Sequence, residues 1–352
     1  MTDERIISRA IGVCSVCISE GHIGLAKQEH ERLRHRDGLI SAIPSIGEIV
    51  CAECGNHCRL KEGDIGFCNI RVARNGEIVD KHSTSAVVSW YFDPLPTNCV
   101  ADWVCPVIKE RELGFGKQRL NNLAVFYGSC NSDCLFCQNA SYRTMMAQGR
   151  PLMTPMELAN AADDQTACVC YFGGDPACNA EHSVKTSKIL NESKQVRVCY
   201  ETNGNISKKW LRTIADIVET TGGTLKFDLK AVTPGIYKAL TGISNSVVLR
   251  NFRELSAAKR ERDGEFLVAS ILLVPGYIDL PEVRNLCKFI AECDPSIPTA
   301  LLGFSPHHAM SDLPRTSRNH AKAALEISKE AGLENVRIGN LGLLGMNNYR
   351  VE

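Results

Sequence analysis

The chain lacks any long apolar run, and neither sign of charge is in excess. None of its hydrophobic segments approaches the roughly 20 residues that a membrane-spanning helix needs. Its 40 Lys and Arg residues equal its 40 Asp and Glu residues, so no net field attracts nucleic acid or an anionic membrane. The N-terminal residues, Met-Thr-Asp-Glu-Arg-Ile, lack the apolar core of a secretion signal. We therefore expect a cytoplasmic protein with neither a membrane nor a nucleic-acid partner.

Low-complexity segments and short-period repeats are also missing, which fits an ordinary globular composition of 44% hydrophobic and 23% charged residues. What the chain has in abundance is cysteine, with 17 residues. In the cytosol such a count favours metal ligands over disulfides. Five cysteines in apolar stretches are expected to be small core residues rather than ligands: Cys168, Cys170, Cys199, Cys287 and Cys293.

The densest thiol motif is Gly128-Ser-Cys-Asn-Ser-Asp-Cys-Leu-Phe-Cys-Gln-Asn139, which places Cys130, Cys134 and Cys137 on one loop. Three thiolates at this spacing can hold three irons of a 4Fe–4S cluster and leave the fourth iron without a protein ligand. An open iron can bind a substrate or cofactor, so such a cluster can do chemistry as well as carry electrons. A structural zinc knuckle, or three unrelated buried thiols, is the alternative interpretation.

Beyond residue 120, apolar strands alternate with amphipathic helical stretches. The expected strands are Leu123–Tyr127, Val169–Phe172, Val196–Tyr200, Leu225–Leu229, Phe266–Leu273, Ala300–Phe304 and Val336–Ile338. Continuous apolar strands that alternate with helices predict a parallel sheet of βα units. The fold class is therefore α/β, a partial or complete (β/α) barrel whose chemistry lies at the carboxyl ends of the strands.

Four segments are expected along the chain. Residues 1–85 form a cysteine-rich, metal-binding leader, and residues 86–120 form a connector that wraps the barrel mouth. Residues 121–345 form the barrel, and residues 346–352 form a tail.

Polar or glycine-rich elements end successive strands. They are Tyr171-Phe-Gly-Gly-Asp-Pro176, Cys199-Tyr-Glu-Thr-Asn-Gly204, Lys226-Phe-Asp-Leu-Lys230, Leu273-Val-Pro-Gly-Tyr-Ile-Asp279 and Gly303-Phe-Ser-Pro-His-His308. Each polar residue alone could be a helix cap or a surface charge, and Asp228 with Lys230 could be a structural ion pair. Together they predict a ligand site at the barrel mouth.

The order of these motifs resembles that of the radical S-adenosylmethionine (SAM) enzymes, in particular pyruvate formate-lyase activating enzyme and the AmmeMemoRadiSam-type proteins. The resemblance covers roughly residues 120–340. It implies a 4Fe–4S cluster on Cys130, Cys134 and Cys137 whose open iron chelates SAM, which is cleaved to a 5′-deoxyadenosyl radical. The residues that it implies for cofactor binding are Phe136, Gly173, Gly174, Asp175, Glu201, Asn203, Asp228, Lys230, Pro275, Gly276 and His308.

The leader carries a second group of thiols. The relatives suggest Cys51, Cys54, Cys58 and Cys68 as one ligand set, whereas the pairing of Cys-x2-Cys knuckles suggests Cys14, Cys17, Cys51 and Cys54. A mononuclear zinc or iron site, a second iron–sulfur cluster and no metal all stay open. A metal here would supply folding energy to a segment with little core of its own.

The resemblance implies an anaerobic, protein-modifying enzyme with a protein or peptide substrate and an electron donor such as ferredoxin or flavodoxin. No insert fits between Cys137 and the second strand, so we favour C-methylation of a protein, as in enzymes that modify methyl-coenzyme M reductase. That reaction needs a methyl donor such as cobalamin, although no Asp-x-His-x2-Gly motif is present. Activation of a glycyl-radical enzyme and a non-catalytic iron–sulfur electron-transfer protein are the alternatives.

Overall fold

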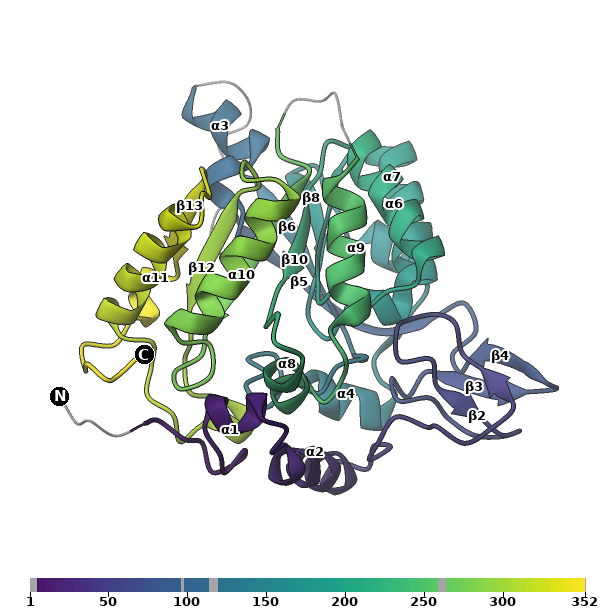
Figure 1. Ribbon diagram of the computed structural model, residues 1–352. Helices are drawn as coiled ribbons and strands as arrows, with labels where there is room; N and C mark the ends of the chain where they lie inside the picture. The colour runs from purple at the N-terminus through teal and green to yellow at the C-terminus, as the bar shows by residue number, and fades with distance from the viewer. Residues whose placement is uncertain (1–4, 96–97, 114–119, 259–263, 352) are drawn as a thin grey trace.

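A nine-stranded, mostly parallel sheet forms the centre of the computed structural model, which describes residues 5–95, 98–113, 120–258 and 264–351 (Figure 1). The strand order is β13-β12-β11-β10-β9-β8-β6-β5-β7. Among the described residues no pairing joins β13 to β7, so the sheet is an open, partial barrel. This confirms the predicted α/β fold class.

The seven parallel strands follow the chain in order. They are β6 (Asn121–Tyr127), β8 (Thr166–Tyr171), β9 (Arg197–Thr202), β10 (Leu225–Asp228), β11 (Leu267–Leu273), β12 (Thr299–Gly303) and β13 (Val336–Gly339). Each overlaps a strand expected from the sequence. Residues on both faces of the sheet are buried, which is why β6 carries a continuous apolar run at residues 123–127.

Helices cover the outer face of this sheet (Figure 1). They are α5 (Pro155–Asn160), α6 (Ala180–Lys194), α7 (Lys208–Thr220), α9 (Ser246–Ser256), α10 (Leu280–Cys293) and α11 (Arg318–Glu330), whereas α8 (Pro234–Thr241) lies at the mouth end of the barrel. Helix α7 shows why they form. The Ser207 side chain accepts a hydrogen bond from the backbone of Trp210 at the first turn, and the apolar face buries Trp210, Leu211 and Ile214.

The prediction that residues 86–120 wrap the barrel mouth is wrong for the described part of this segment, residues 86–95, 98–113 and 120, and residues 96–97 and 114–119 lie outside the described residues. Strand β5 (Ala86–Pro94) pairs antiparallel with β6, so that Val88 lies opposite Tyr127 at the mouth and Pro94 lies opposite Asn121 at the far end. An antiparallel strand therefore carries the chain away from the mouth. The following 3-10 helix η1 (Asp102–Val104) and helix α3 (Pro106–Glu112) lie beside the amino ends of β8 and β9.

The leader, by contrast, lies against the mouth. Its helices α1 (Ser15–Ser19) and α2 (Gly24–Arg36) contact α8, which follows β10, and they lie with α8 and α4 (Tyr142–Gln148) at one end of the molecule (Figure 1). Short antiparallel pairs complete the leader: β1 (Ile49–Val50) with β2 (Arg59–Leu60), and β3 (Arg71–Arg74) with β4 (Glu77–Asp80).

Short elements complete the described chain. They are β7 (Leu152–Met153) and the 3-10 helices η2 (Pro176–Asn179), η3 (His308–Met310) and η4 (Leu341–Leu343). The C-terminal tail is docked, since the Leu280 amide donates to the carbonyl of Val351. Within the described ranges, no helix has both the length and the apolar character needed to cross a bilayer.

Candidate cluster and cofactor site

A cavity of about 180 Å³ opens at the carboxyl ends of the parallel strands. Ten of the predicted site residues line it: Cys130, Cys134, Phe136, Cys137, Gly174, Asp175, Glu201, Asn203, Asp228 and Lys230. Tyr142, Thr202 and Ser270 also line the cavity and were not predicted. The strand-end motifs therefore converge on the cysteine loop, as the barrel topology requires.

The three loop cysteines present their thiols to this cavity from a protected position. Burial raises the pKa of Cys130 and Cys134, and it raises that of Cys137 to about 11. Soft thiolate sulfur is the ligand that iron–sulfur clusters use. Iron would replace the protons that burial otherwise retains on these thiols.

Asn203, at the end of β9, holds the cysteine loop in place. Its Nδ2 donates to Oδ1 of Asn131 at 2.8 Å and to Oγ of Ser132 at 3.1 Å, and it lies 3.9 Å from Sγ of Cys130. Its side chain is therefore engaged with the loop, and it also accepts a hydrogen bond from the Asn205 amide. Asn203 thus links the strand end to the loop.

Asp175, which follows the paired glycines Gly173 and Gly174, links the end of β8 to the end of β9. Its Oδ1 accepts from the Ala177 amide at 2.8 Å and from Oγ1 of Thr202 at 2.9 Å, and its Oδ2 accepts from the Asn203 amide at 2.7 Å. Burial raises its pKa to about 6, although these hydrogen bonds oppose the shift. At Gly174 the backbone has φ +63°, and a Cβ there would lie 2.1 Å from the carbonyl oxygen of Tyr127. Only glycine permits this close approach.

Charged side chains on β9 and β10 line the cavity wall. Glu201 and Lys226 are register partners on these strands, and Lys226 Nζ lies 3.6 Å from Glu201 Oε2. Lys230 forms an ion pair with Asp228, as the sequence allowed. Burial opposes the charge of Lys230, but Asp228 and Cys134 outweigh it and raise its pKa. The site thus offers both a carboxylate and a cation to a zwitterionic ligand.

Asp133, inside the cysteine motif, anchors a network that the sequence did not reveal. The carboxylate is 1% exposed. Three basic side chains contact it: His30 and Arg34 of α2, and Arg143 of α4. Burial alone would raise the pKa of Asp133, but the His30 hydrogen bond and the two guanidinium groups lower it. The signal in the sequence was the spacing of His30 and Arg34, which places both on one face of a helix.

Four predicted cofactor residues do not line this cavity. Gly173 packs against the Phe126 ring. Pro275 and Gly276 lie next to the N-terminal end of the leader, where a Cβ on Gly276 would lie 2.3 Å from the carbonyl oxygen of Ile6. His308 lines a neighbouring cavity with Arg143. Tyr277 follows Gly276 directly, and its hydroxyl accepts a hydrogen bond from the Ser8 amide and donates one to the Val13 carbonyl.

Of the two ligand sets proposed for the leader, the structure gathers one. Cys51, Cys54, Cys58 and Cys68 line a small cavity, and Cys178 of η2 joins them from the barrel. A hydrogen bond from Cys178 lowers the pKa of Cys68 to about 6. Cys14 and Cys17 lie elsewhere, with their sulfurs 3.7 Å apart.

The side chains of the described ranges include no group of three or more His, Cys, Asp or Glu residues arranged to hold a single metal ion. This applies to the leader thiols and to the loop cysteines alike. A cubane separates its thiolates more widely than a single ion does, so the statement concerns mononuclear sites. The loop cysteines, with their shared cavity and soft sulfur donors, fit a cluster.

Further thiols gather at the opposite end of the barrel. Cys99, Cys105, Cys168, Cys170 and Cys199 line one cavity with Lys226. Lys226 Nζ lies 3.1 Å from Sγ of Cys170 and 3.8 Å from Sγ of Cys99. Cys168 and Cys170 are buried, as expected of core residues, but their neighbour is an ammonium group rather than apolar side chains alone. The strand-end motif that contains Lys226 did not indicate that its ammonium group would lie among these thiols.

The comparisons with known proteins agree with the site. The model of the Radical SAM superfamily matches residues 124–290, which contain the cysteine loop and the strand-end motifs up to Asp279. The resemblance inferred from the motifs is thereby confirmed for these residues, which make up just under half of the chain.

The individual relatives are only distantly similar to this chain in sequence. An uncharacterized protein of Methanocaldococcus jannaschii is 26% identical over 308 residues, covering 86% of this chain and 84% of the relative. The indoleacetate decarboxylase activating enzyme of Tractidigestivibacter scatoligenes is 24% identical over 181 residues, which is 49% of this chain and about half (53%) of that enzyme. The solved structure of a domain of pyruvate-formate lyase-activating enzyme from Bacteroides vulgatus is 19% identical, with a TM-score of 0.41, and covers 49% of this chain and 99% of that domain.

Proposed function

We propose that the radical SAM domain of this chain makes it an enzyme that cleaves SAM and abstracts a hydrogen atom from a residue of a protein or peptide. One observation carries the proposal. The three loop cysteines share a single cavity with the carboxylate, amide and ammonium groups at the ends of β8, β9 and β10. That combination can hold a cluster and a zwitterionic ligand side by side.

Different residues of this cavity would hold the cluster and SAM. Cys130, Cys134 and Cys137 would hold the 4Fe–4S cluster, and Glu201 and Asp228 would receive the cationic groups of SAM. When bound, the cluster and SAM supply an electron and the 5′-deoxyadenosyl radical. The buried loop and the leader over the mouth exclude water from that radical. An external donor such as ferredoxin or flavodoxin would reduce the cluster.

The fate of the substrate has two candidates. Activation of a glycyl-radical enzyme is supported by the similarity to a protein that is named as a decarboxylase activating enzyme. Protein C-methylation, which the sequence analysis favoured, is supported by the position of the leader at the mouth, where it could cover a second cofactor such as cobalamin. The similarity to known proteins supports a radical SAM enzyme in general and does not distinguish between these two reactions.

A second metal in the leader is part of the proposal. Four leader thiols and Cys178 of η2 line one cavity. They are not arranged around a single ion among the described residues, so a zinc or iron centre would require the thiols to close around it, and it would then tie the leader to the barrel next to the Gly-Gly-Asp-Pro turn. Cys178 would extend the ligand set that was predicted from the sequence.

The test is the anaerobic reaction of the full-length protein with dithionite and SAM. We expect 5′-deoxyadenosine, with about four irons per chain plus any leader metal. A non-catalytic electron carrier would hold the iron without forming 5′-deoxyadenosine. A corrinoid absorption band in the purified protein would favour methylation, and a glycyl-radical electron paramagnetic resonance signal in a partner protein would favour activation.

A further inference from the structure

Two leader cysteines, Cys14 and Cys17, have no part in the sites described above. They line neither the cofactor cavity nor the cavity of the other leader thiols. Cys14 precedes α1 directly and Cys17 lies in its first turn, at the mouth end of the barrel (Figure 1). Their Cys-x2-Cys spacing, which suggested metal ligands in the sequence, is also the spacing of redox-active dithiols.

The sulfur atoms of this pair already lie close together. Sγ of Cys14 is 3.7 Å from Sγ of Cys17. In a helical turn, Cα atoms three positions apart are separated by roughly 5 Å, which is within the span that a disulfide bridges. Rotation of the two side chains is therefore enough to bring the sulfurs into bonding distance.

The surroundings of Cys14 favour its thiolate, which is the form that attacks a disulfide. Nη1 of Arg5 lies 3.4 Å from the Cys14 sulfur. Burial alone would raise the pKa of Cys14, but the backbone of Cys17 and the Arg5 guanidinium outweigh it and lower the pKa to about 7. A substantial share of Cys14 is thus ionised at neutral pH.

Cys17 gives the pair access to solvent. It is partly exposed, whereas Cys14 is buried. Cys293, at the end of α10, is also partly exposed, but its neighbours are Ser256 and Arg253 rather than a second thiol. The leader pair therefore combines an accessible thiol, a close second sulfur and a nearby cation.

The chain on both sides of the pair is held in place. The Tyr277 hydroxyl accepts from the Ser8 amide and donates to the Val13 carbonyl. Helix α1 packs against α8 so closely that a Cβ on Gly235 would lie 2.7 Å from the carbonyl oxygen of Ile18. A dithiol that is held in one geometry forms its disulfide at a higher effective concentration than a flexible one.

We propose that Cys14 and Cys17 form a redox-active dithiol that an external disulfide oxidises by thiol–disulfide exchange. The thiolate of one cysteine attacks a sulfur of the external disulfide, so that a mixed disulfide forms and one thiol leaves. The other cysteine then attacks the mixed disulfide and releases the second thiol. Two electrons and two protons pass from the pair to the two released thiols. The pair lies outside the cofactor cavity, and its oxidation does not depend on the proposed function.

The test equilibrates the full-length protein, purified anaerobically, with reduced and oxidised glutathione at about 1 mM each, close to the effective concentration of a flexible pair. Rapid alkylation with N-ethylmaleimide stops the exchange before digestion with trypsin. The tryptic peptide of residues 10–27, between the cleavage sites after Arg9 and Lys27, contains both cysteines and no other. Its mass therefore distinguishes the disulfide, the alkylated dithiol and a glutathione adduct.

We expect the internal disulfide in more than half of the molecules, and dithiothreitol should reverse it. The effective concentration of the pair should be at least about tenfold higher in the folded protein than in the same chain unfolded in urea. A parallel series with oxidised thioredoxin in place of oxidised glutathione distinguishes a protein disulfide from a small one as the faster oxidant.

Two variants locate the reaction. Cys14→Ser should leave Cys17 as a mixed disulfide with glutathione, because no second thiol can displace it. Cys293→Ser removes a partly exposed cysteine that has no thiol neighbour, and the peptide of residues 10–27 should then oxidise as in the wild type.

Three outcomes would overturn the proposal: a pair that stays a dithiol, a wild-type peptide that carries glutathione without an internal disulfide, or equal effective concentrations in the folded and unfolded chain. Formation of 5′-deoxyadenosine in the same preparation reports separately on the proposed function. A protein that forms it but keeps the dithiol refutes the redox site alone. A protein that forms the disulfide but no 5′-deoxyadenosine refutes the proposed function alone.

Discussion

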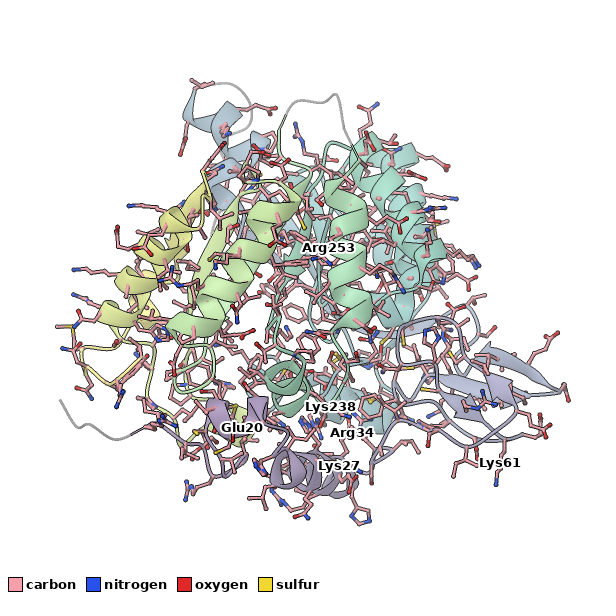
Figure 2. All side chains as sticks on the ribbon, viewed as in Figure 1. Glu20, Lys27, Arg34, Lys61, Lys238 and Arg253 are labelled. Atoms are coloured by element: carbon pink, nitrogen blue, oxygen red, sulfur yellow. The ribbon has the colours of Figure 1, made fainter. Side chains whose placement is uncertain are left out.

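Nδ1 of His30, in the leader helix α2, lies 2.8 Å from Oδ2 of Asp133, which stands between the first two cysteines of the cluster loop. Arg34, one helical turn further on, lies 3.4 Å from the other carboxylate oxygen and also donates to the Phe67 carbonyl. Figure 2 shows Arg34 with Lys27 and Lys238 where α2 meets α8. The leader therefore fixes the loop directly.

Asp133→Asn should destabilise the protein strongly. The change removes the one negative charge that His30, Arg34 and Arg143 share in a buried position. Breaking a buried ion pair in this way costs about 3–5 kcal/mol. Urea denaturation of the anaerobic protein measures the loss. Asp216→Asn, on the exposed face of α7, should change stability by less than about 0.5 kcal/mol, and an equal effect of the two changes would refute the structural role of Asp133.

Cys134→Ser should abolish cluster binding and 5′-deoxyadenosine formation. Losses of about 10–100-fold accompany changes merely next to metal ligands, so removal of a ligand should reach at least the upper end. Iron analysis and chromatography of the products provide the measurement. Cys287→Ser is the matched control, because Cys287 contacts Ser328 between α10 and α11. Unchanged product formation in the Cys134 variant would exclude the proposed cluster.

Glu201→Gln should weaken SAM binding about tenfold, because a charge-assisted hydrogen bond contributes about 1.5–3 kcal/mol. The carboxylate lines the cavity and is paired with Lys226. Equilibrium dialysis with labelled SAM measures the dissociation constant. Glu254→Gln, which breaks the exposed contact with Arg212 on the outer helices, should leave it unchanged. If both variants bind SAM as the wild type does, Glu201 is not a cofactor ligand.

Cys58→Ser should remove the leader metal, whereas Cys14→Ser should retain it. Cys58 shares a cavity with Cys51, Cys54, Cys68 and Cys178, whereas Cys14 lies apart from them and contacts Cys17 and Arg5. Metal analysis of both variants, with iron and zinc counted separately, decides between the two ligand sets. The reverse pattern would favour the set that includes Cys14 and Cys17.

Stability should fall as the pH drops from about 6.5 toward 4, partly through His182. Burial lowers its pKa to about 4, below the unfolded value near 6.5. The unfolded chain thus binds the proton first, and the stabilisation present above pH 6.5 is lost as the pH falls through the folded pKa. His182→Gln should flatten this dependence in urea titrations at pH 7.5 and 5. The exposed His22→Gln should not alter it, and identical slopes for the His182 variant and the wild type would contradict the assignment.

The strands and the cysteine loop could be predicted because their signals are local. A strand that is buried on both faces carries a largely continuous apolar run, as at residues 123–127 of β6 and 169–171 of β8. Each strand-end motif follows its strand directly, and parallel topology then brings the motifs together. The prediction failed for the connector because strand direction depends on pairing. The sequence of β5 does not say that it runs antiparallel to β6.

The contacts between leader and barrel could not be predicted for a different reason. Helix α2 buries Ala26 and Leu33, but also His30 and Arg34, so its buried face is not a continuous apolar stripe. The Asp133 carboxylate, which both polar residues contact, lies about 100 positions further along the chain. Asn56 illustrates the same limit, because it donates to the Asn131 carbonyl and accepts from Asn205. No residue near Asn56 in the sequence indicates that Asn131 and Asn205 are its partners.

Lys226 connects the two ends of the barrel through a single ammonium group, with Glu201 at the cofactor cavity and Cys170 and Cys99 at the opposite end. Alkylation of either thiol places a bulky group beside Lys226 and so disturbs its ion pair with Glu201 without touching an iron ligand. Inactivation by a thiol-blocking reagent would therefore have two possible origins in this protein: modification of the cluster cysteines, or modification of the thiols beside Lys226. Inactivation by such a reagent becomes evidence about iron binding only when iron is counted in the same sample.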